Sequence, residues 1–236
     1  MWGFKEDPPQ KNAPDFLGIG AQKAGTTWLY ENLKQHPDLY FPPMKEVHFW
    51  DLFYDKGLDW YKDLFPANGD VRGEITPAYA ILPIDKIKEI YVMNPDLRLI
   101  YLVRNPRDRA WSAAKMMMNR QGLVFEKTPD EWFIKQFQSQ DSRMRGDYES
   151  CLTNWKSVFP NEQILVLDYS KITKNPVDLM VKICAHISIP ANFFKKRSAQ
   201  LTEKIFSGSG EEIRPSLKKI LAEIYPDEVV YKTLIG

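Results

Sequence analysis

The sequence predicts an α/β fold of three layers, in which helices flank a central, mainly parallel sheet. Two observations predict it. Short apolar runs rich in branched residues alternate along the chain with segments of helical spacing, a pattern typical of parallel sheets covered on both faces. The chain has 236 residues, of which 44% are hydrophobic, so it can bury a sizeable core. No Gly- or Ser-rich linker divides residues 1–236, so we expect a single domain with an irregular N-terminal segment at 1–14.

Four segments are predicted strands. The first is 16–20, Phe-Leu-Gly-Ile-Gly, which ends where a polar, glycine-containing loop begins. The clearest is 97–103, because branched and apolar residues dominate it. The other two are 71–75 and 164–167.

Seven segments are predicted helices. The first, 26–35, follows the first strand closely and places Trp28, Leu29 and Leu33 on one face. It ends at His36-Pro37, because proline disfavours helix in the residue before it. The remaining predicted helices are 84–93, 107–119, 131–138, 148–159, 177–187 and 217–225.

The composition argues against several classes of protein. The 32 Lys and Arg residues nearly balance the 31 Asp and Glu residues, so the chain does not bind nucleic acid through bulk positive charge. Its two cysteines cannot build the disulfide framework of a small secreted domain or a four-cysteine zinc site. No apolar run approaches the ~20 residues of a membrane helix, and the polar, Pro-rich N-terminus is unlike a signal peptide.

The loop after the first strand carries the most information. Backbone N–H groups and the positive end of the following helix make an anion site at such a junction. Gly20 and Gly25 have P-loop spacing, but Lys23 precedes Gly25 by two residues, and no Lys-Ser/Thr pair follows to hold magnesium. The two threonines after Gly25 can donate hydroxyl protons to a phosphate. An ordinary tight turn between strand and helix is the alternative interpretation.

Two motifs in this order resemble a known family. Gln22-Lys-Ala-Gly-Thr-Thr-Trp-Leu29 resembles the 5′-phosphosulfate loop of sulfotransferases that use 3′-phosphoadenosine 5′-phosphosulfate (PAPS). Further along, Tyr101-Leu-Val-Arg-Asn-Pro-Arg-Asp-Arg-Ala-Trp-Ser112 is similar to the family's 3′-phosphate motif. Shorter matches extend the resemblance over roughly residues 15–190: Lys45–Trp50, Glu74–Tyr79, and Gly146–Tyr148 with Trp155. It is closest to the heparan-sulfate-type branch and its bacterial relatives, and it implies a P-loop-like fold.

The resemblance implies sulfuryl transfer from PAPS, with adenosine 3′,5′-bisphosphate (PAP) as product. Lys23 would neutralise the bridging oxygen as the S–O bond breaks. Glu46 matches the position of the family's general base, and His48 would assist it. A carboxyl group with a raised pKa is suited to accepting the proton. The expected donor-binding residues are Gln22, Lys23, Ala24, Gly25, Thr26, Thr27, Trp28, Arg104, Ser112, Tyr148, Lys204, Ser207 and Gly208. The donor has no γ-phosphate, so no metal ion is required.

Several of these residues keep a second interpretation. Trp28 can stack on adenine or pack in the core, and Arg104 can bind phosphate or pair with Asp108. Glu74 can be a second acid–base group or a residue that holds the site together. Relatives often have lysine where this chain has Ile75, which puts a heparan-like mode of acceptor binding in doubt.

We expect the acceptor to be a carbohydrate or small molecule sulfated on a hydroxyl, in preference to an amine. The net charge of +1 disfavours a long polyanion. Neither nucleic acid nor a membrane span is expected, and the oligomeric state stays open. The expected location is cytoplasmic, with a soluble catalytic domain of a longer or lumenal protein as the alternative.

Rival functions are a P-loop kinase or NTPase, against which the displaced lysine argues, and a catalytically inactive nucleotide-binding relative.

Overall fold

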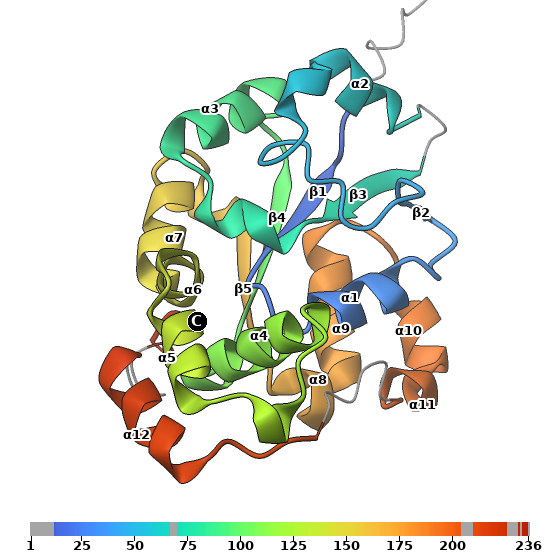
Figure 1. Cartoon of the computed structure of the whole chain (residues 1–236). Helices are drawn as coiled ribbons and strands as arrows, with labels where there is room; N and C mark the ends of the chain where they lie inside the picture. Colours follow the sequence, from blue (N-terminus) through green and yellow to red (C-terminus); the bar gives the residue numbers. More distant parts are fainter. Residues whose placement is uncertain (1–11, 67–69, 204–209, 226–230, 232, 236) are drawn as a thin grey trace, which may run out of the picture.

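The fold is built on a five-stranded sheet in which every strand runs parallel to its neighbours. The computed structural model describes residues 12–66, 70–203, 210–225, 231 and 233–235. The strand order is β2-β3-β1-β4-β5 (Figure 1). The strands are β1 Phe16–Gly20, β2 Leu39–Tyr40, β3 Val71–Ile75, β4 Arg98–Val103 and β5 Ile164–Asp168. The four predicted strands are confirmed. β2 was not predicted, because two residues are too few to show the alternation of apolar and polar residues typical of a strand.

Helices cover both faces of the sheet, with α1 and α9 on one side and α3 and α7 on the other (Figure 1). The helices are α1 Thr26–Leu33, α2 Leu58–Asp63, α3 Ile84–Met93, α4 Pro106–Arg120, α5 Asp130–Gln138, α6 Gln140–Gly146, α7 Tyr148–Lys156, α8 Lys171–Lys174, α9 Pro176–His186, α10 Asn192–Lys196, α11 Ser198–Leu201 and α12 Pro215–Ile224. Four short 3₁₀ turns are η1 Tyr54–Lys56, η2 Pro77–Ile81, η3 Phe125–Lys127 and η4 Asn161–Gln163. The three-layer α/β architecture and all seven predicted helices are confirmed.

The ends of the helices differ from the predicted ends by a few residues. α4 begins one residue early, at Pro106, because the Asn105 side chain caps it by accepting hydrogen bonds from the N–H groups of Arg107 and Asp108. Of the predicted irregular N-terminal segment, residues 1–11 lie outside the described part, and 12–14 contain no helix or strand. A single domain stays a prediction. No helix in the described part of the chain has the length and apolarity to cross a membrane.

Side chains of β1 and β3 fill the space over glycines of the neighbouring strand. Every residue of β1 is buried. A Cβ on Gly73 of β3 would lie 2.1 Å from Cζ of Phe16 in β1, and one on Gly18 would lie 2.8 Å from Ile75 Cγ1. Phe16 is fully buried, so its ring has no free space into which to move. These glycines therefore set how tightly β1 and β3 pack.

The connections between strands make the carboxyl ends of β1 and β4 the expected position of a binding site. From β1 the chain passes through α1 toward β2, at one edge of the sheet. From β3 it passes through α3 to β4, on the other side of β1. Ligands of open α/β sheets bind where connections diverge in this way. The segments that leave the carboxyl ends of these strands are therefore the ones to examine for a site.

The variant Gly73→Ala tests the packing of β3 on β1. We expect it to lower the free energy of unfolding by about 1–3 kcal/mol, because the added methyl group meets the immobile Phe16 ring. Urea unfolding measures the loss. In a Phe16→Leu background the added cost should be smaller, since the ring is gone. An equal cost in both backgrounds would contradict this account.

Candidate functional site

The loop between β1 and α1 forms a candidate anion site at the carboxyl edge of the sheet. Gly25 takes a φ of 91°, a left-handed conformation that favours glycine, and a Cβ there would lie 2.3 Å from Ile172 Cδ1. α1 begins at the next residue, Thr26, and has no side-chain cap. The N–H groups of its first turn therefore face the loop without a capping side chain, which is the arrangement that binds anions.

The other residues of this loop divide into buried and partly exposed positions. Ala24 and Thr26 are buried, and the Ala24 N–H closes the turn on the carbonyl of Ala21 at 3.1 Å. Gln22 and Thr27 are partly exposed, so their side chains can reach a bound molecule. The expected phosphate loop thus has both an ordered backbone and accessible side chains.

Arg104 lies beside the backbone of Lys23. Arg104 follows the end of β4, and its Nη1 donates to the carbonyl of Lys23 at 3.2 Å. Its guanidinium lies over the ring of Tyr169, 4.6 Å from the centroid. Arg104 forms no ion pair with Asp108 among the described residues, and its buried Nε has no hydrogen-bond partner. Burial and the neighbouring charge of Arg104 lower the pKa of Lys23. Two cations held this close indicate a site for an anionic ligand.

Ser112 and Tyr148 differ in their exposure and in their contact with Arg104. Ser112 lies in the second turn of α4 and is partly exposed, so its hydroxyl can reach solvent or a ligand. Tyr148 is buried, and its hydroxyl donates to the carbonyl of Arg104 at 2.8 Å. Tyr148 therefore holds the backbone from which the Arg104 side chain extends.

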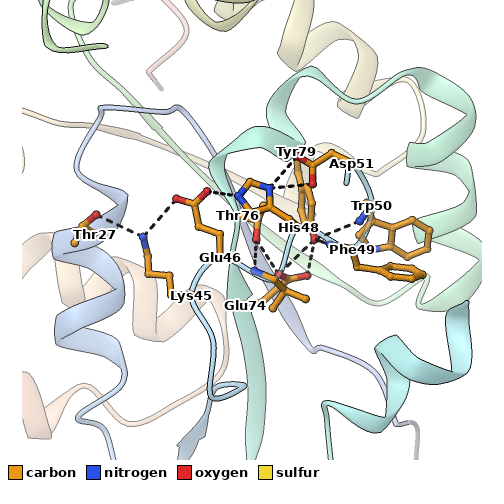
Figure 2. Close-up of polar contacts among 11 residues, drawn as sticks. Thr27, Lys45, Glu46, His48, Phe49, Trp50, Asp51, Glu74, Thr76 and Tyr79 are labelled. Carbon is orange, nitrogen blue, oxygen red and sulfur yellow. Dashed lines mark hydrogen bonds and ion pairs between the residues drawn. The ribbon is translucent and has the colours of Figure 1, made fainter. Parts of the chain in front are cut away.

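Glu46, His48 and Asp51 form a hydrogen-bonded cluster beside the phosphate loop (Figure 2). His48 Nε2 lies 3.0 Å from Glu46 Oε2, and Nδ1 lies 2.9 Å from Asp51 Oδ2. Hydrogen bonds to Asp51 and Glu46 raise the pKa of His48 to about 9. The imidazole is therefore charged at neutral pH and donates from both nitrogens.

The expected raised pKa of Glu46 is wrong. Burial alone would raise it, but the hydrogen bond from His48 and the charge of Lys45 outweigh burial, and the pKa is lowered. Glu46 is therefore an ionised carboxylate in the free protein. An ionised carboxylate can accept a proton, so a lowered pKa makes Glu46 a weaker base, and its role as general base stays a prediction.

Lys45 connects the two halves of the site. Its Nζ lies 3.5 Å from Thr27 Oγ1 in α1 and 3.8 Å from Glu46 Oε1 (Figure 2). Burial lowers the pKa of Lys45. The phosphate loop and the carboxylate cluster are thus neighbours.

Other expected site residues are placed less directly. Trp28 is 7% exposed in the main core, and its indole N–H donates to the carbonyl of Leu201 at 3.2 Å. Its packing is therefore observed, and its contact with the donor stays a prediction. Lys204, Ser207 and Gly208 lie outside the described residues. Among the residues that the structure describes, no group of three or more His, Cys, Asp or Glu side chains could hold a metal ion.

Glu74 and Ile75 lie at the end of β3, but the first contacts hydroxyl groups and the second contacts apolar side chains. Glu74 is 1% exposed and accepts hydrogen bonds from the hydroxyls of Tyr61, Thr76 and Tyr79. Burial raises the pKa of Glu74 to about 7. Ile75 is 2% exposed and packs against β1, so its side chain belongs to the core and not to the site.

The sequence alone did not single out Asp51, Lys45 and Tyr169 as site residues. Each lies next to a residue that the motifs had singled out or at the carboxyl edge of the sheet. Asp51 follows His48 by three residues, and Tyr169 directly follows β5. An acidic residue close after a candidate histidine, and an aromatic residue after a buried strand, are the signals that could have found them.

Comparisons with known proteins identify relatives of this chain. A family model described as a sulfotransferase domain matches residues 13–209. Mouse heparan sulfate glucosamine 3-O-sulfotransferase 6 is 33% identical over 174 residues, which cover 72% of this chain and 50% of that protein. Human heparan sulfate glucosamine 3-O-sulfotransferase 3A1 is 32% identical over 186 residues, 72% of this chain and 43% of the relative. The chain thus spans about half the length of the curated relatives it matches.

Solved structures show the same architecture. A sulfotransferase from Alicyclobacillus acidocaldarius superposes with a TM-score of 0.71 at 27% identity, covering 94% of this chain and 95% of that one. A mouse sulfotransferase, SULT7A1, solved in complex with PAP, has a TM-score of 0.57 at 21% identity and covers 91% of this chain and 73% of its own; this likeness concerns the fold. The match of a family model to most of the chain, with the curated relatives, shows that this protein belongs to the sulfotransferase family.

Proposed function

We propose that this chain transfers a sulfuryl group from PAPS to a hydroxyl group of a carbohydrate or small-molecule acceptor. One observation carries the proposal: a pair of cations at an uncapped helix N-terminus lies next to an ionised carboxylate, and Lys45 contacts both sides. The family and its heparan sulfate 3-O-sulfotransferase members support the reaction. Sulfuryl transfer resembles phosphoryl transfer, in which positioning and charge stabilisation supply most of the catalysis.

The residues of the anion site fit a donor with two phosphate-bearing ends. PAPS would supply the sulfuryl group, and PAP would leave as the bond between sulfur and the 5′-phosphate oxygen breaks. Lys23, the N–H groups of α1 and the side chains of Thr26 and Thr27 would hold that phosphate and neutralise its growing charge. Arg104 and Ser112 would bind the 3′-phosphate, since a guanidinium with an unpartnered Nε is a strong, permanently charged donor.

The carboxylate cluster would act on the acceptor. Glu46 would take the proton of the acceptor hydroxyl as its oxygen attacks sulfur. His48 cannot itself act as the base while it is protonated. It would assist by holding the Glu46 carboxylate in place, with Asp51 fixing the other ring nitrogen.

The rival functions fit less well. Family membership disfavours a P-loop kinase or NTPase. The assembled cluster of Glu46, His48 and Asp51 disfavours an inactive relative, because the proposed base and its partners are all retained. The chain is similar to enzymes named for heparan sulfate. This similarity favours a catalytic domain of a longer or lumenal protein over a cytoplasmic protein.

The first test concerns the donor. Arg104→Ala should weaken PAP binding by about tenfold to a hundredfold, the value of hydrogen bonds to a charged group. Titration calorimetry with PAP and with ATP–magnesium measures it. Arg98→Ala is the matched control, because Arg98 lies at the opposite end of β4 and donates to the Glu162 carbonyl. Preference for ATP–magnesium, or unchanged PAP affinity in Arg104→Ala, would overturn the proposal.

The second test concerns the base. Glu46→Gln should lower turnover by about a hundredfold or more, since the amide cannot accept the proton. It should leave PAP affinity unchanged. The assay uses labelled PAPS with heparan sulfate, monosaccharides and simple alcohols as acceptors. Glu149→Gln, an exposed position in α7, serves as control. If turnover stays within a few-fold, Glu46 is not the base.

The third test uses pH. The pKa of His48 lies at about 9, above its ordinary value of 6.5, so its proton stabilises the folded state. This stabilisation is fully present below pH 6.5 and is lost as pH rises through 9. The difference in unfolding temperature between wild type and His48→Gln should therefore be largest at pH 6 and smallest at pH 10.

His186→Gln is the matched control for this pH test. Burial lowers the pKa of His186, so the stabilisation due to its neutral ring is lost as pH falls and does not shrink between pH 6.5 and 9. A difference for His48→Gln that stays constant over the whole range would show that His48 is not held as a cation.

A further inference from the structure

Glu74 is a buried carboxylate whose hydrogen-bond partners are hydroxyl groups. Tyr61 donates its hydroxyl proton to Oε1, Thr76 Oγ1 donates to Oε2 at 2.9 Å, and the Tyr79 hydroxyl donates to Oε1 at 3.2 Å. No Lys or Arg in the described part of the chain forms an ion pair with it. Burying an unpaired carboxylate costs free energy, and hydrogen bonds offset only part of that cost. A carboxylate buried at such a cost is expected to have a role in the structure or the function of the protein.

Two of these hydroxyls also accept hydrogen bonds from the segment that carries the proposed base. Val47 N–H donates to Thr76 Oγ1 at 3.2 Å, and Phe49 N–H donates to the Tyr79 hydroxyl at 2.9 Å (Figure 2). A hydroxyl has one proton to donate and two lone pairs to accept with. When Glu74 is ionised it takes the proton of each, so both hydroxyl oxygens are oriented to accept from the 47–49 backbone.

That segment needs anchoring. His48 has a φ of 54°, a left-handed conformation that residues with a Cβ seldom adopt. Val47 and Phe49, its neighbours on both sides, are the residues whose N–H groups the two hydroxyls hold. The direction of the His48 and Glu46 side chains therefore depends on these two bonds.

We propose that Glu74 is a positioning residue, which holds Glu46 and His48 in their working arrangement through the hydroxyls of Thr76 and Tyr79. The inference rests on the proposed role of Glu46 as base. It decides between the two interpretations that the residues alone left open. Glu74 is 1% exposed, and both its oxygens are engaged by protein hydroxyls, so it cannot meet an acceptor as a second acid–base group.

The variant Glu74→Gln tests the inference. Its amide nitrogen donates, so one hydroxyl has to accept from the amide and give its own proton elsewhere, which puts the amide in competition with the backbone N–H for that oxygen. Hydrogen exchange followed by NMR should speed up at the Val47 and Phe49 amides by about tenfold or more, with amides of β1 and β4 unchanged. With labelled PAPS and the acceptors above, kcat should fall by about tenfold or more, while KM for PAPS and PAP affinity stay within twofold.

A pair of variants at Thr76 keeps the test independent of how well Glu74→Gln folds. Thr76→Val removes the hydroxyl and should reproduce the faster exchange at Val47 and the lower kcat. Thr76→Ser keeps the hydroxyl and should restore both. Thr76 is fully buried, so the two variants are matched in place and differ in the hydroxyl.

The outcomes separate this inference from the proposed function. If Glu46→Gln abolishes turnover while Glu74→Gln and Thr76→Val keep wild-type exchange and kcat, the positioning role is overturned and the base stands. If Glu46→Gln retains turnover, the proposed base fails, and the positioning role fails with it. Equal loss of kcat and PAP affinity in Glu74→Gln would show general damage to the fold, which also contradicts the inference.

Discussion

The packing of β1 between β3 and β4 is the constraint on which the site depends. In the sheet register, Leu17 of β1 lies beside Glu74 of β3 on one side and Leu99 of β4 on the other. Parallel strands in fixed register end at the same edge, so the phosphate loop, Arg104 and the Thr76 hydroxyl leave the sheet together. Gly18 and Gly73 leave room for side chains of the neighbouring strand at the β1–β3 contact, where a Cβ would lie 2.8 Å from Ile75 and 2.1 Å from Phe16.

Charge in this protein is balanced over the chain and separated within the site. The net charge is +1, yet Lys23 and Arg104 gather on the side of the helix N-terminus, and Glu46 is ionised on the other. Burial of Lys23 and the Arg104 charge beside it lower the pKa of Lys23, so the free site is electrostatically unfavourable until an anion enters. A highly anionic donor and a hydroxyl that must lose a proton are suited to these two sides.

Hydrogen bonds hold the carboxylate cluster from two directions. Asp51 and Glu46 share the protonated ring of His48, and this fixes the side chains. Glu74 fixes the backbone between them through hydroxyls that are themselves buried. Side-chain and backbone control together can give a reacting group the precision that catalysis requires.

Four of the five strands, the seven main helices and the family could be predicted from the sequence, because each shows as a local period or a contiguous motif. Lys23 and Arg104 could also be placed at one edge of the sheet, since parallel strands end there, whereas Glu46 was indicated by the family resemblance. Only the tertiary structure decided that Glu46 has a lowered pKa and that Glu74 supports its loop. The physical reason is that protonation and anchoring depend on burial and on partners distant in the chain, such as Tyr79 with Phe49, which no local pattern records.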